Sequence, residues 1–247
     1  MPAAPILLLD QTDSTNAEAR RRADAGETGP LWIVARRQTA GRGRRGRQWE
    51  SQDGNLFSTL MQVTRKSPAE AAQVTFVAAL AIADLLDDWA PASLVTIKWP
   101  NDVMLAGQKA SGVLVESGAH ESGGLWLAVG IGVNLAEAPP RDQVERPTAA
   151  LADIAGVAPP APADFLAGVA GRFESWREIW MRDGFPPVGE AWTRMAEGLG
   201  GPCTARLPDR TLTGTAEALE ADGALRLRLD GGEVVRVTAG DVFFGET

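Results

Sequence analysis

The chain has very little cysteine and histidine: among its 247 residues, Cys203 is the only cysteine and His120 the only histidine. A lone cysteine excludes an internal disulfide, and a zinc site of several Cys and His ligands is not expected. A catalytic triad that needs a second histidine is equally unavailable. Both residues are interpreted as structural, so the chemistry must come from lysine, arginine, carboxylate and backbone groups.

The sequence also lacks a long apolar run and a basic N-terminal segment. Its first ten residues contain a four-residue apolar run, Ile6 to Leu9, which predicts a strand and not a signal peptide. The longest apolar-rich stretch, residues 76–89, is interrupted by three aspartates and falls short of the roughly 18 residues that a membrane span needs. We therefore expect a cytoplasmic protein with no membrane partner.

Positive charge is in deficit as well, with 24 Lys and Arg against 32 Asp and Glu, a formal net charge of −8. An acidic chain is not typical of a general nucleic-acid or membrane binder. Its 45% hydrophobic and 23% charged residues are ordinary for a globular protein.

Local patterns predict an α+β body at residues 1–197 and a small β-barrel at 198–247, where polar and apolar residues alternate between closely spaced turns. A Ser67-Pro68-Ala69-Glu70 capping box predicts a buried helix over about 71–89. Other helices are expected at about 17–26, 148–155, 163–182 and 189–197. Strands are expected at 6–9, 31–35, 55–64, 94–99, 103–105, 112–116 and 125–135, and from residue 94 on they look like consecutive antiparallel strands.

A glycine- and arginine-rich segment, Gly41-Arg42-Gly43-Arg44-Arg45-Gly46-Arg47, stands out against the acidic background. Interleaved glycines allow backbone N–H groups to converge on an anion, and guanidinium groups bind phosphate or carboxylate in bidentate fashion. The segment is neither a P-loop nor a dinucleotide-binding fingerprint. A solvated loop and a nucleic-acid contact are the alternative interpretations.

A second motif is Lys98-Trp99-Pro100-Asn101-Asp102 at a strand end, followed by Lys109-Ala110-Ser111-Gly112. A lysine on an otherwise apolar strand needs a counter-charge, and Asp102 is an available partner for Lys98. An ordinary strand-end ion pair is the alternative.

Two further motifs are weaker alone. Gly130 and Gly132 alternate in an apolar strand ending at Asn134, which indicates close approach by a ligand, by tightly packed backbone or by a dimer partner. Ser14, Thr15 and Asn16 precede a helix, where they would either cap it or bind a ligand acceptor group.

In combination, the order of these motifs resembles the biotin protein ligase family. The matching elements are D-S-T-N from Asp13, Q-T-x-G-R-G-R-x-G-R-x-W from Gln38, KWPND from Lys98, K-x-S-G-x-L-x-E from Lys109 and G-x-G-x-N from Gly130. The resemblance covers residues 6–135 strongly, continues weakly over 146–151 and returns at 239–242. It implies a central mixed, mostly antiparallel sheet flanked by helices, of the class II synthetase-like or SH2-like type, with a C-terminal SH3-like barrel.

The resemblance also implies site residues. It places biotin at Ser14, Thr15, Asn16, Gln38, Gly41, Arg42, Gly43, Arg44, Lys109 and Gly112. ATP and the adenylate would contact Arg42, Arg44, Trp49, Lys109 and Asn134, and the candidate catalytic residues are Arg42, Lys109, Asp102 and Lys98. No protein-held metal is implied; Mg²⁺ would accompany ATP.

The implied activity joins biotin to ATP as biotinyl-5′-adenylate and passes biotin to a lysine of a biotin carboxyl carrier domain of acetyl-CoA carboxylase or a related carboxylase. Asp13 lies so near the start that no N-terminal DNA-binding domain is expected, so the resemblance is to the monofunctional form. A lipoate ligase is the nearest alternative enzyme and a nucleic-acid-binding module the alternative of another class. A cysteine acyl enzyme is disfavoured because Cys203 lies outside every motif.

Overall fold

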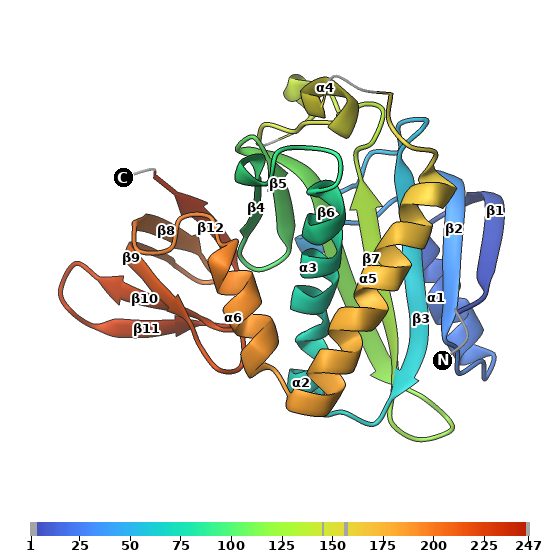
Figure 1. The fold of residues 1–247 in the computed structure, drawn as a ribbon. Helices are drawn as coiled ribbons and strands as arrows, with labels where there is room; N and C mark the ends of the chain where they lie inside the picture. Colours follow the sequence, from blue (N-terminus) through green and yellow to red (C-terminus); the bar gives the residue numbers. More distant parts are fainter. Residues whose placement is uncertain (1–3, 145, 156–157, 246–247) are drawn as a thin grey trace.

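The computed structural model describes residues 4–144, 146–155 and 158–245, which form a central seven-stranded sheet and a C-terminal five-stranded sheet (Figure 1). In spatial order the central strands are β1 (Ile6–Thr12), β2 (Leu31–Gln38), β3 (Leu56–Thr64), β7 (Leu125–Val133), β6 (Gln108–Ala119), β5 (Asp102–Leu105) and β4 (Val95–Lys98). The β1–β2 pair is parallel and the other neighbouring pairs are antiparallel. The expected mixed, mostly antiparallel sheet is confirmed.

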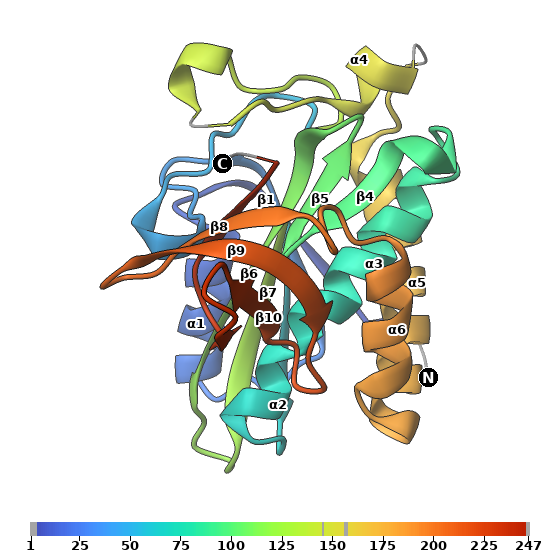
Figure 2. The same cartoon turned by 90° about the vertical axis from the view of Figure 1, so that its left-hand side faces the viewer.

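Helices cover both faces of this sheet, as the turned view shows (Figure 2). One face packs against α1 (Thr15–Asp24); the helices of the opposite side are α2 (Pro68–Ala72), α3 (Val74–Leu86), α5 (Pro162–Asp183) and α6 (Pro186–Arg194). The short helix α4 (Leu151–Ala155) and the 3₁₀ turns η1 (Arg44–Gly46), η2 (Ala92–Leu94) and η3 (Arg141–Gln143) lie in connections. The predicted capping box is present, because the Ser67 hydroxyl accepts from the Glu70 N–H while the Glu70 carboxylate accepts from the Ser67 N–H.

The apolar helix pair α2–α3 forms the centre of the main core. Contrary to the expectation that no apolar stretch is long enough, Pro68–Leu86 is long and apolar enough to cross a membrane by length and composition. However, 67% of this stretch is buried inside the molecule, where it packs against the sheet and α5. It therefore has the surroundings of a core helix.

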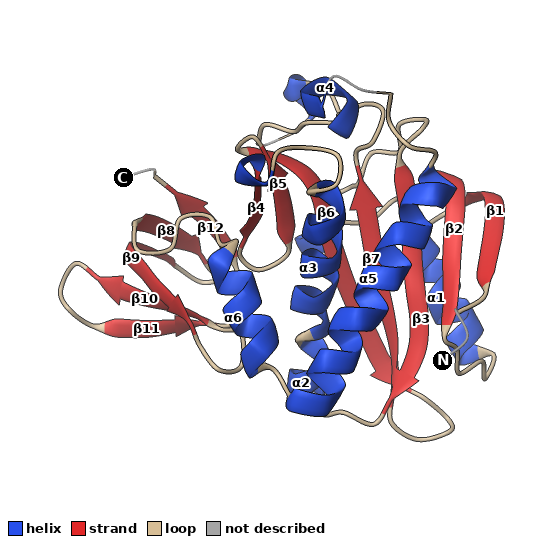
Figure 3. Ribbon diagram, in the orientation of Figure 1, coloured by secondary structure: helices blue, strands red, loops and turns tan. Residues whose placement is uncertain are grey.

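The C-terminal sheet is antiparallel throughout and stands at one side of the central sheet (Figure 3). In spatial order its strands are β11 (Val234–Val237), β10 (Leu225–Leu229), β9 (Thr211–Leu219), β8 (Pro202–Arg206) and β12 (Asp241–Phe244). The indole of Trp99, just beyond β4, donates to the carbonyl of Gly223 at 3.0 Å. This bond ties the KWPND segment to the C-terminal sheet.

Several predicted boundaries need correction. β1 continues to Thr12, and β6 begins at Gln108, so Lys109 lies in a strand and not in a hairpin loop. α6 begins three residues earlier than expected, because Pro186 is preorganised for the first helical turn, and α4 begins only at Leu151. β7 lies between β3 and β6 with both edges paired, so the proposed dimer edge at residues 125–135 is wrong.

Candidate active site

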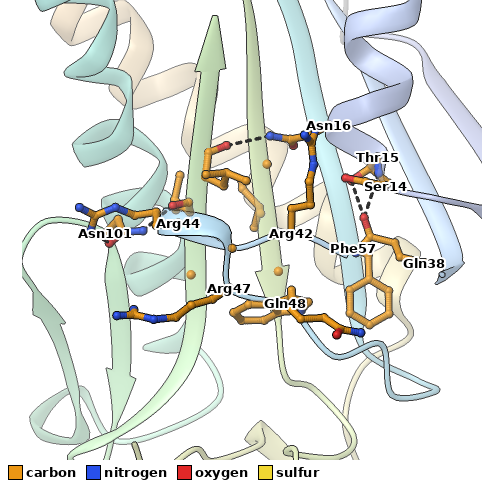
Figure 4. A pocket seen from close by; sticks show the side chains of 18 of the residues that line it. Ser14, Thr15, Asn16, Gln38, Arg42, Arg44, Arg47, Gln48, Phe57 and Asn101 are labelled. Carbon is orange, nitrogen blue, oxygen red and sulfur yellow. Dashed lines mark hydrogen bonds between the residues drawn. The ribbon is translucent and has the colours of Figure 1, made fainter. Parts of the chain in front are cut away.

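A cavity opens between the start of α1, the glycine- and arginine-rich loop and the β5, β6 and β7 strands (Figure 4). It gathers most of the side chains that the sequence motifs singled out. Its lining includes Ser14, Thr15, Asn16, Gln38, Arg42, Gly43, Arg44, Trp49, Asp102, Lys109 and Gly112. Segments from residue 14 to residue 241 therefore meet in one place.

One end of the cavity is polar without net charge. The side-chain oxygen of Gln38, Oε1, accepts from the Thr15 N–H at 2.9 Å and from the Thr15 hydroxyl at 3.2 Å. Ser14 is the residue before the first turn of α1, but its side chain makes no capping hydrogen bond. Capping by the Ser14 side chain, the simpler interpretation of this motif, is therefore wrong.

The side chain of Asn16 lies over Gly130 on one face of the sheet. It reaches Leu114 and Glu116 on β6, where its Nδ2 donates to the Leu114 carbonyl at 3.2 Å and to the Glu116 carboxylate at 2.8 Å. A Cβ on residue 130 would collide with the Asn16 carboxamide, so glycine is needed at this position.

Two further glycines, Gly112 and Gly132, form the middle of the cavity floor. Gly112 on β6 and Gly132 on β7 are register partners, and the Trp49 indole lies directly over both. A Cβ on Gly132 would overlap the Trp49 ring, and one on Gly112 would lie 3.1 Å from it. Close approach was predicted at Gly130 and Gly132 and is confirmed at both. The approaching groups, however, are the side chains of Asn16 and Trp49 and not the ligand, backbone or dimer partner that was expected.

The other end of the cavity is cationic. Lys109 forms an ion pair with Asp102 at 2.7 Å, and its Nζ lies 5.4 Å from the centre of the Trp49 ring. Both side chains of the pair are largely buried, with 26% of Lys109 and 15% of Asp102 exposed. A β-bulge between Val103 and Met104 shifts the register of the two strands that carry them.

The arginine-rich loop is held against the C-terminal sheet through Arg44, which is partly buried there, whereas Arg42, Arg45 and Arg47 stay exposed. Arg44 donates to the Asn101 side chain at 2.9 Å and to the Gly240 carbonyl at 3.0 Å. Burial lowers the pKa of the Arg44 guanidinium, against the opposing effect of nearby Asp102 and Asp241. The interpretation of this segment as a solvated loop is wrong for Arg44.

Asp241, at the start of β12, is the carboxylate on which the loop converges. Its side chain pairs with Arg45 at 3.0 Å and, more closely, with Arg47. Desolvation raises the pKa of Asp241, but the hydrogen bond from Arg47 and the charges of the nearby arginines outweigh it and lower the pKa below its ordinary value. The junction is therefore an ion-pair network between the loop and the C-terminal sheet.

Three predicted site residues lie outside the cavity lining. Lys98 is opposite Asp102 in the β4–β5 register but lies under the Phe243 and Phe244 rings at 5.7 and 5.8 Å. The buried Asn134 donates to the Ala149 carbonyl at 3.3 Å. Gly41 accepts from the Trp49 N–H at 3.0 Å and so shapes the loop.

Other residues at the cavity were not assigned a role from the sequence. Asn101 belongs to the KWPND motif and Glu116 to the K-x-S-G-x-L-x-E motif, so their membership in these motifs could have indicated a role at the site. Thr59, whose hydroxyl donates to Asn16 Oδ1 at 2.7 Å, carried no signal in the sequence. Asp241 lies in the segment 239–242 where the resemblance returns, but its role arises from the docking of the C-terminal sheet and was not assigned.

Neither a metal centre nor a reactive thiol is evident at this site. In the described parts of the chain, no group of three or more His, Cys, Asp and Glu side chains gathers as metal ligands. The two carboxylates that line the cavity, Asp102 and Asp241, are paired with cations. Cys203 is buried in β8, and this burial raises the pKa of its thiol to about 11.

Comparison with known proteins agrees with this geometry. Residues 8–134 match the biotin/lipoate A/B protein ligase family, and residues 198–245 match the biotin protein ligase C-terminal domain. The chain belongs to the biotin protein ligase family. Within that family it is 43% identical to the biotin–[acetyl-CoA-carboxylase] ligase of Paracoccus denitrificans, over 96% of this chain and all of the relative.

Three further biotin protein ligases are similar to this chain at lower identity. The bifunctional ligase/repressor of Bacillus subtilis is 30% identical over 97% of this chain, which spans 74% of that protein. The structure of the Aquifex aeolicus biotin protein ligase in complex with biotin and ATP shares the fold, with a TM-score of 0.82, 24% identity and coverage of 98% and 99% of the two chains. The Leishmania major biotin protein ligase in complex with biotinyl-5-AMP aligns with a TM-score of 0.65 and 27% identity, over 97% of this chain and all of the other.

Proposed function

We propose that this biotin protein ligase family member is a biotin–[acetyl-CoA-carboxylase] ligase. It joins biotin to ATP as biotinyl-5′-adenylate and transfers biotin to one lysine of a carrier domain. The observation that carries the proposal is the polarity of the cavity, which is neutral and polar at Asn16 and Gln38, glycine-floored in the middle and cationic at Lys109 and Arg44. Biotin has the matching order of ureido group, aliphatic chain and carboxylate.

The first half-reaction brings two anions together. A biotin carboxylate oxygen bonds to the α-phosphorus of ATP, the bond from that phosphorus to the β-bridging oxygen breaks, and pyrophosphate leaves. Lys109, Arg42 and Arg44 provide the positive charge that stabilises this transition state. Asp102 orients Lys109 through their ion pair.

In the second half-reaction the carrier lysine nitrogen bonds to the acyl carbon, the bond from that carbon to the phosphate oxygen breaks, and AMP leaves while the nitrogen loses a proton. Because water would hydrolyse the mixed anhydride, the arginine loop and Trp49 cover the cavity until the carrier docks. We place residues 1–197 as the catalytic domain and 198–247 as the domain that anchors this loop.

Mg²⁺ does not fit a site made by this chain, because the cavity carboxylates are already paired with cations. We propose that it is held by the ATP phosphate oxygens, where it would neutralise their charge. The macromolecular partner is a carrier protein in the cytoplasm and not a nucleic acid, because Arg45 and Arg47 are paired with Asp241 and the chain as a whole carries a net charge of −8.

The decisive experiment is biotin-dependent exchange of labelled pyrophosphate into ATP by the purified chain, with lipoate and octanoate in parallel. Exchange with biotin alone is expected, followed by labelling of a carrier domain when it is added. Exchange with lipoate in place of biotin would refute the proposed substrate, and absence of exchange with all three acids in folded protein would refute the adenylation chemistry.

A further inference from the structure

Glu116 is the carboxylate that links the neutral end of the cavity to the arginine loop. A single oxygen of its side chain accepts from Asn16 Nδ2 at 2.8 Å and from Arg42 Nη2 at 2.9 Å. These two donors come from α1 and from the loop, while Glu116 itself lies on β6. Nothing in the reaction as described above uses this carboxylate.

The orientation of the Asn16 carboxamide is determined by its neighbours. Thr59, Gly130 and Leu114 lie in one register row across β3, β7 and β6, and the carboxamide lies over the glycine. On the β3 side the Thr59 hydroxyl donates to Asn16 Oδ1 at 2.7 Å.

On the β6 side the Leu114 carbonyl and Glu116 offer acceptors to the Asn16 NH₂ group. A flipped amide would set its oxygen against these two acceptors, so only the observed orientation is satisfied. Both Asn16 N–H donors are consumed, and Oδ1 keeps one lone pair for a donor on the ligand.

The second contact of Glu116 is of a different kind. The Arg42 and Glu116 side chains are 42% and 32% exposed, so their ion pair is weakened by water and is easily exchanged for another anion. In this structure Arg42 lines the cavity, and its guanidinium is paired with the Glu116 carboxylate.

We propose, on the basis of the proposed function, that Glu116 is a positioning residue with two separable effects. It fixes Asn16 as a hydrogen-bond acceptor that selects a ligand head group bearing an N–H, such as a cyclic urea, over a ring without one. It also forms an ion pair with Arg42 and thereby competes with the ligand carboxylate for that guanidinium.

Two substitutions separate these effects. Glu116→Gln keeps an acceptor for Asn16 but removes the charge that competes for Arg42, whereas Glu116→Met removes both. Dissociation constants for biotin and for biotin methyl ester, which lacks the carboxylate, are measured by titration calorimetry on the full chain.

We expect Glu116→Met to weaken binding of biotin methyl ester by about tenfold or more, the scale for leaving a buried donor unpaired. Binding of biotin itself should weaken less, because Arg42 is released for the biotin carboxylate. Glu116→Gln is expected to bind biotin at least as tightly as the wild type and to leave the methyl ester unchanged. Because Glu116→Met and Asn16→Leu remove the same hydrogen bond, the double variant should bind biotin no more weakly than Asn16→Leu alone.

The matched control is Glu217→Met on β9, whose carboxylate also bridges two arginines, Arg226 and Arg228, but is not part of the cavity lining. Its biotin affinity should equal that of the wild type. If Glu116→Met does not fold, Glu116→Ala, which also removes the acceptor for Asn16, is combined with Asn16→Leu in its place, and additive effects of these two substitutions overturn the positioning role. If the wild type binds biotin but folded Glu116→Met binds the methyl ester as tightly as the wild type does, the positioning role fails while the proposed function stands. A wild type that binds no biotin defeats both.

Discussion

Lys109 combines three features that suit a group acting on an anionic centre. It is largely buried, it is oriented by Asp102, and its ammonium lies beside the glycine floor on which Trp49 rests. A charge held in place before the reaction needs little reorganisation as negative charge develops on the ligand.

Replacing Lys109 by alanine should therefore reduce adenylate formation by on the order of 10²- to 10³-fold, the scale for removing one preorganised donor. Pyrophosphate exchange at saturating biotin and ATP measures this. Lys66→Ala is the control, since Lys66 pairs with Glu70 and lies over the Trp180 ring, outside the lining of the cavity. Near-normal exchange by Lys109→Ala would exclude Lys109 from the chemistry.

Cys203 illustrates the opposite case, a residue whose environment suppresses its reactivity. Burial raises the pKa of its thiol to about 11, so the nucleophilic thiolate is scarce near neutral pH. We expect iodoacetamide at pH 8 to leave the folded protein unlabelled and to modify one site after unfolding in urea, as mass spectrometry would show. Rapid labelling of the native protein would revive a cysteine-based mechanism.

At the level of elements, β7 contributes to the site through the side chains that it lacks. Gly130 leaves room for the Asn16 carboxamide and Gly132 for the Trp49 indole. A methyl group on either glycine would collide with the group that lies over it. Gly132→Ala should displace Trp49 and lower the affinity for ATP and biotin by about tenfold or more, an effect on the scale of overpacking a filled site. The control is Gly171→Ala on α5, where a Cβ meets open space; equal affinities in the two variants would contradict the role of the floor.

The elements also show where sequence reasoning succeeds and where it stops. Periodicity and caps located the buried helix and most strands, because these signals are local to residues such as Ser67 and Glu70. The partner of Asp102 was assigned to Lys98 from proximity in the chain. A β-bulge decides which side chains meet there, and Asp102 pairs with Lys109. The role of Asp241 was missed because it lies 194 residues from Arg47, and only the docked sheets bring them together.

At the level of the whole molecule, the arginine loop and the C-terminal sheet are joined through Asp241, whose side chain is 11% exposed. Its pKa is lowered in the folded state, so its contribution to stability is complete above the ordinary aspartate pKa of about 4 and is lost as the pH falls through the lower folded value.

Asp241→Asn should accordingly lower the free energy of unfolding by about 1–3 kcal/mol near pH 7, the scale of hydrogen bonds to charged groups. The difference from the wild type should shrink as the pH falls below about 4, because protonated aspartate and asparagine are then both uncharged. Urea titrations from pH 7 to pH 3 test this. A difference that is constant with pH would mean that the ion pairs are not its source.

The glycine floor affects how the site would look in a systematic mutational survey. At most positions an alanine scan tests what is lost when a side chain is shortened, but at Gly112, Gly130 and Gly132 alanine adds a methyl group and tests what the site cannot accommodate. Their importance becomes visible only when atoms are added, and it should grow with the size of the substituent. A saturation scan of this protein should therefore show two kinds of sensitive position, cationic side chains that cannot be shortened and backbone positions that cannot be enlarged.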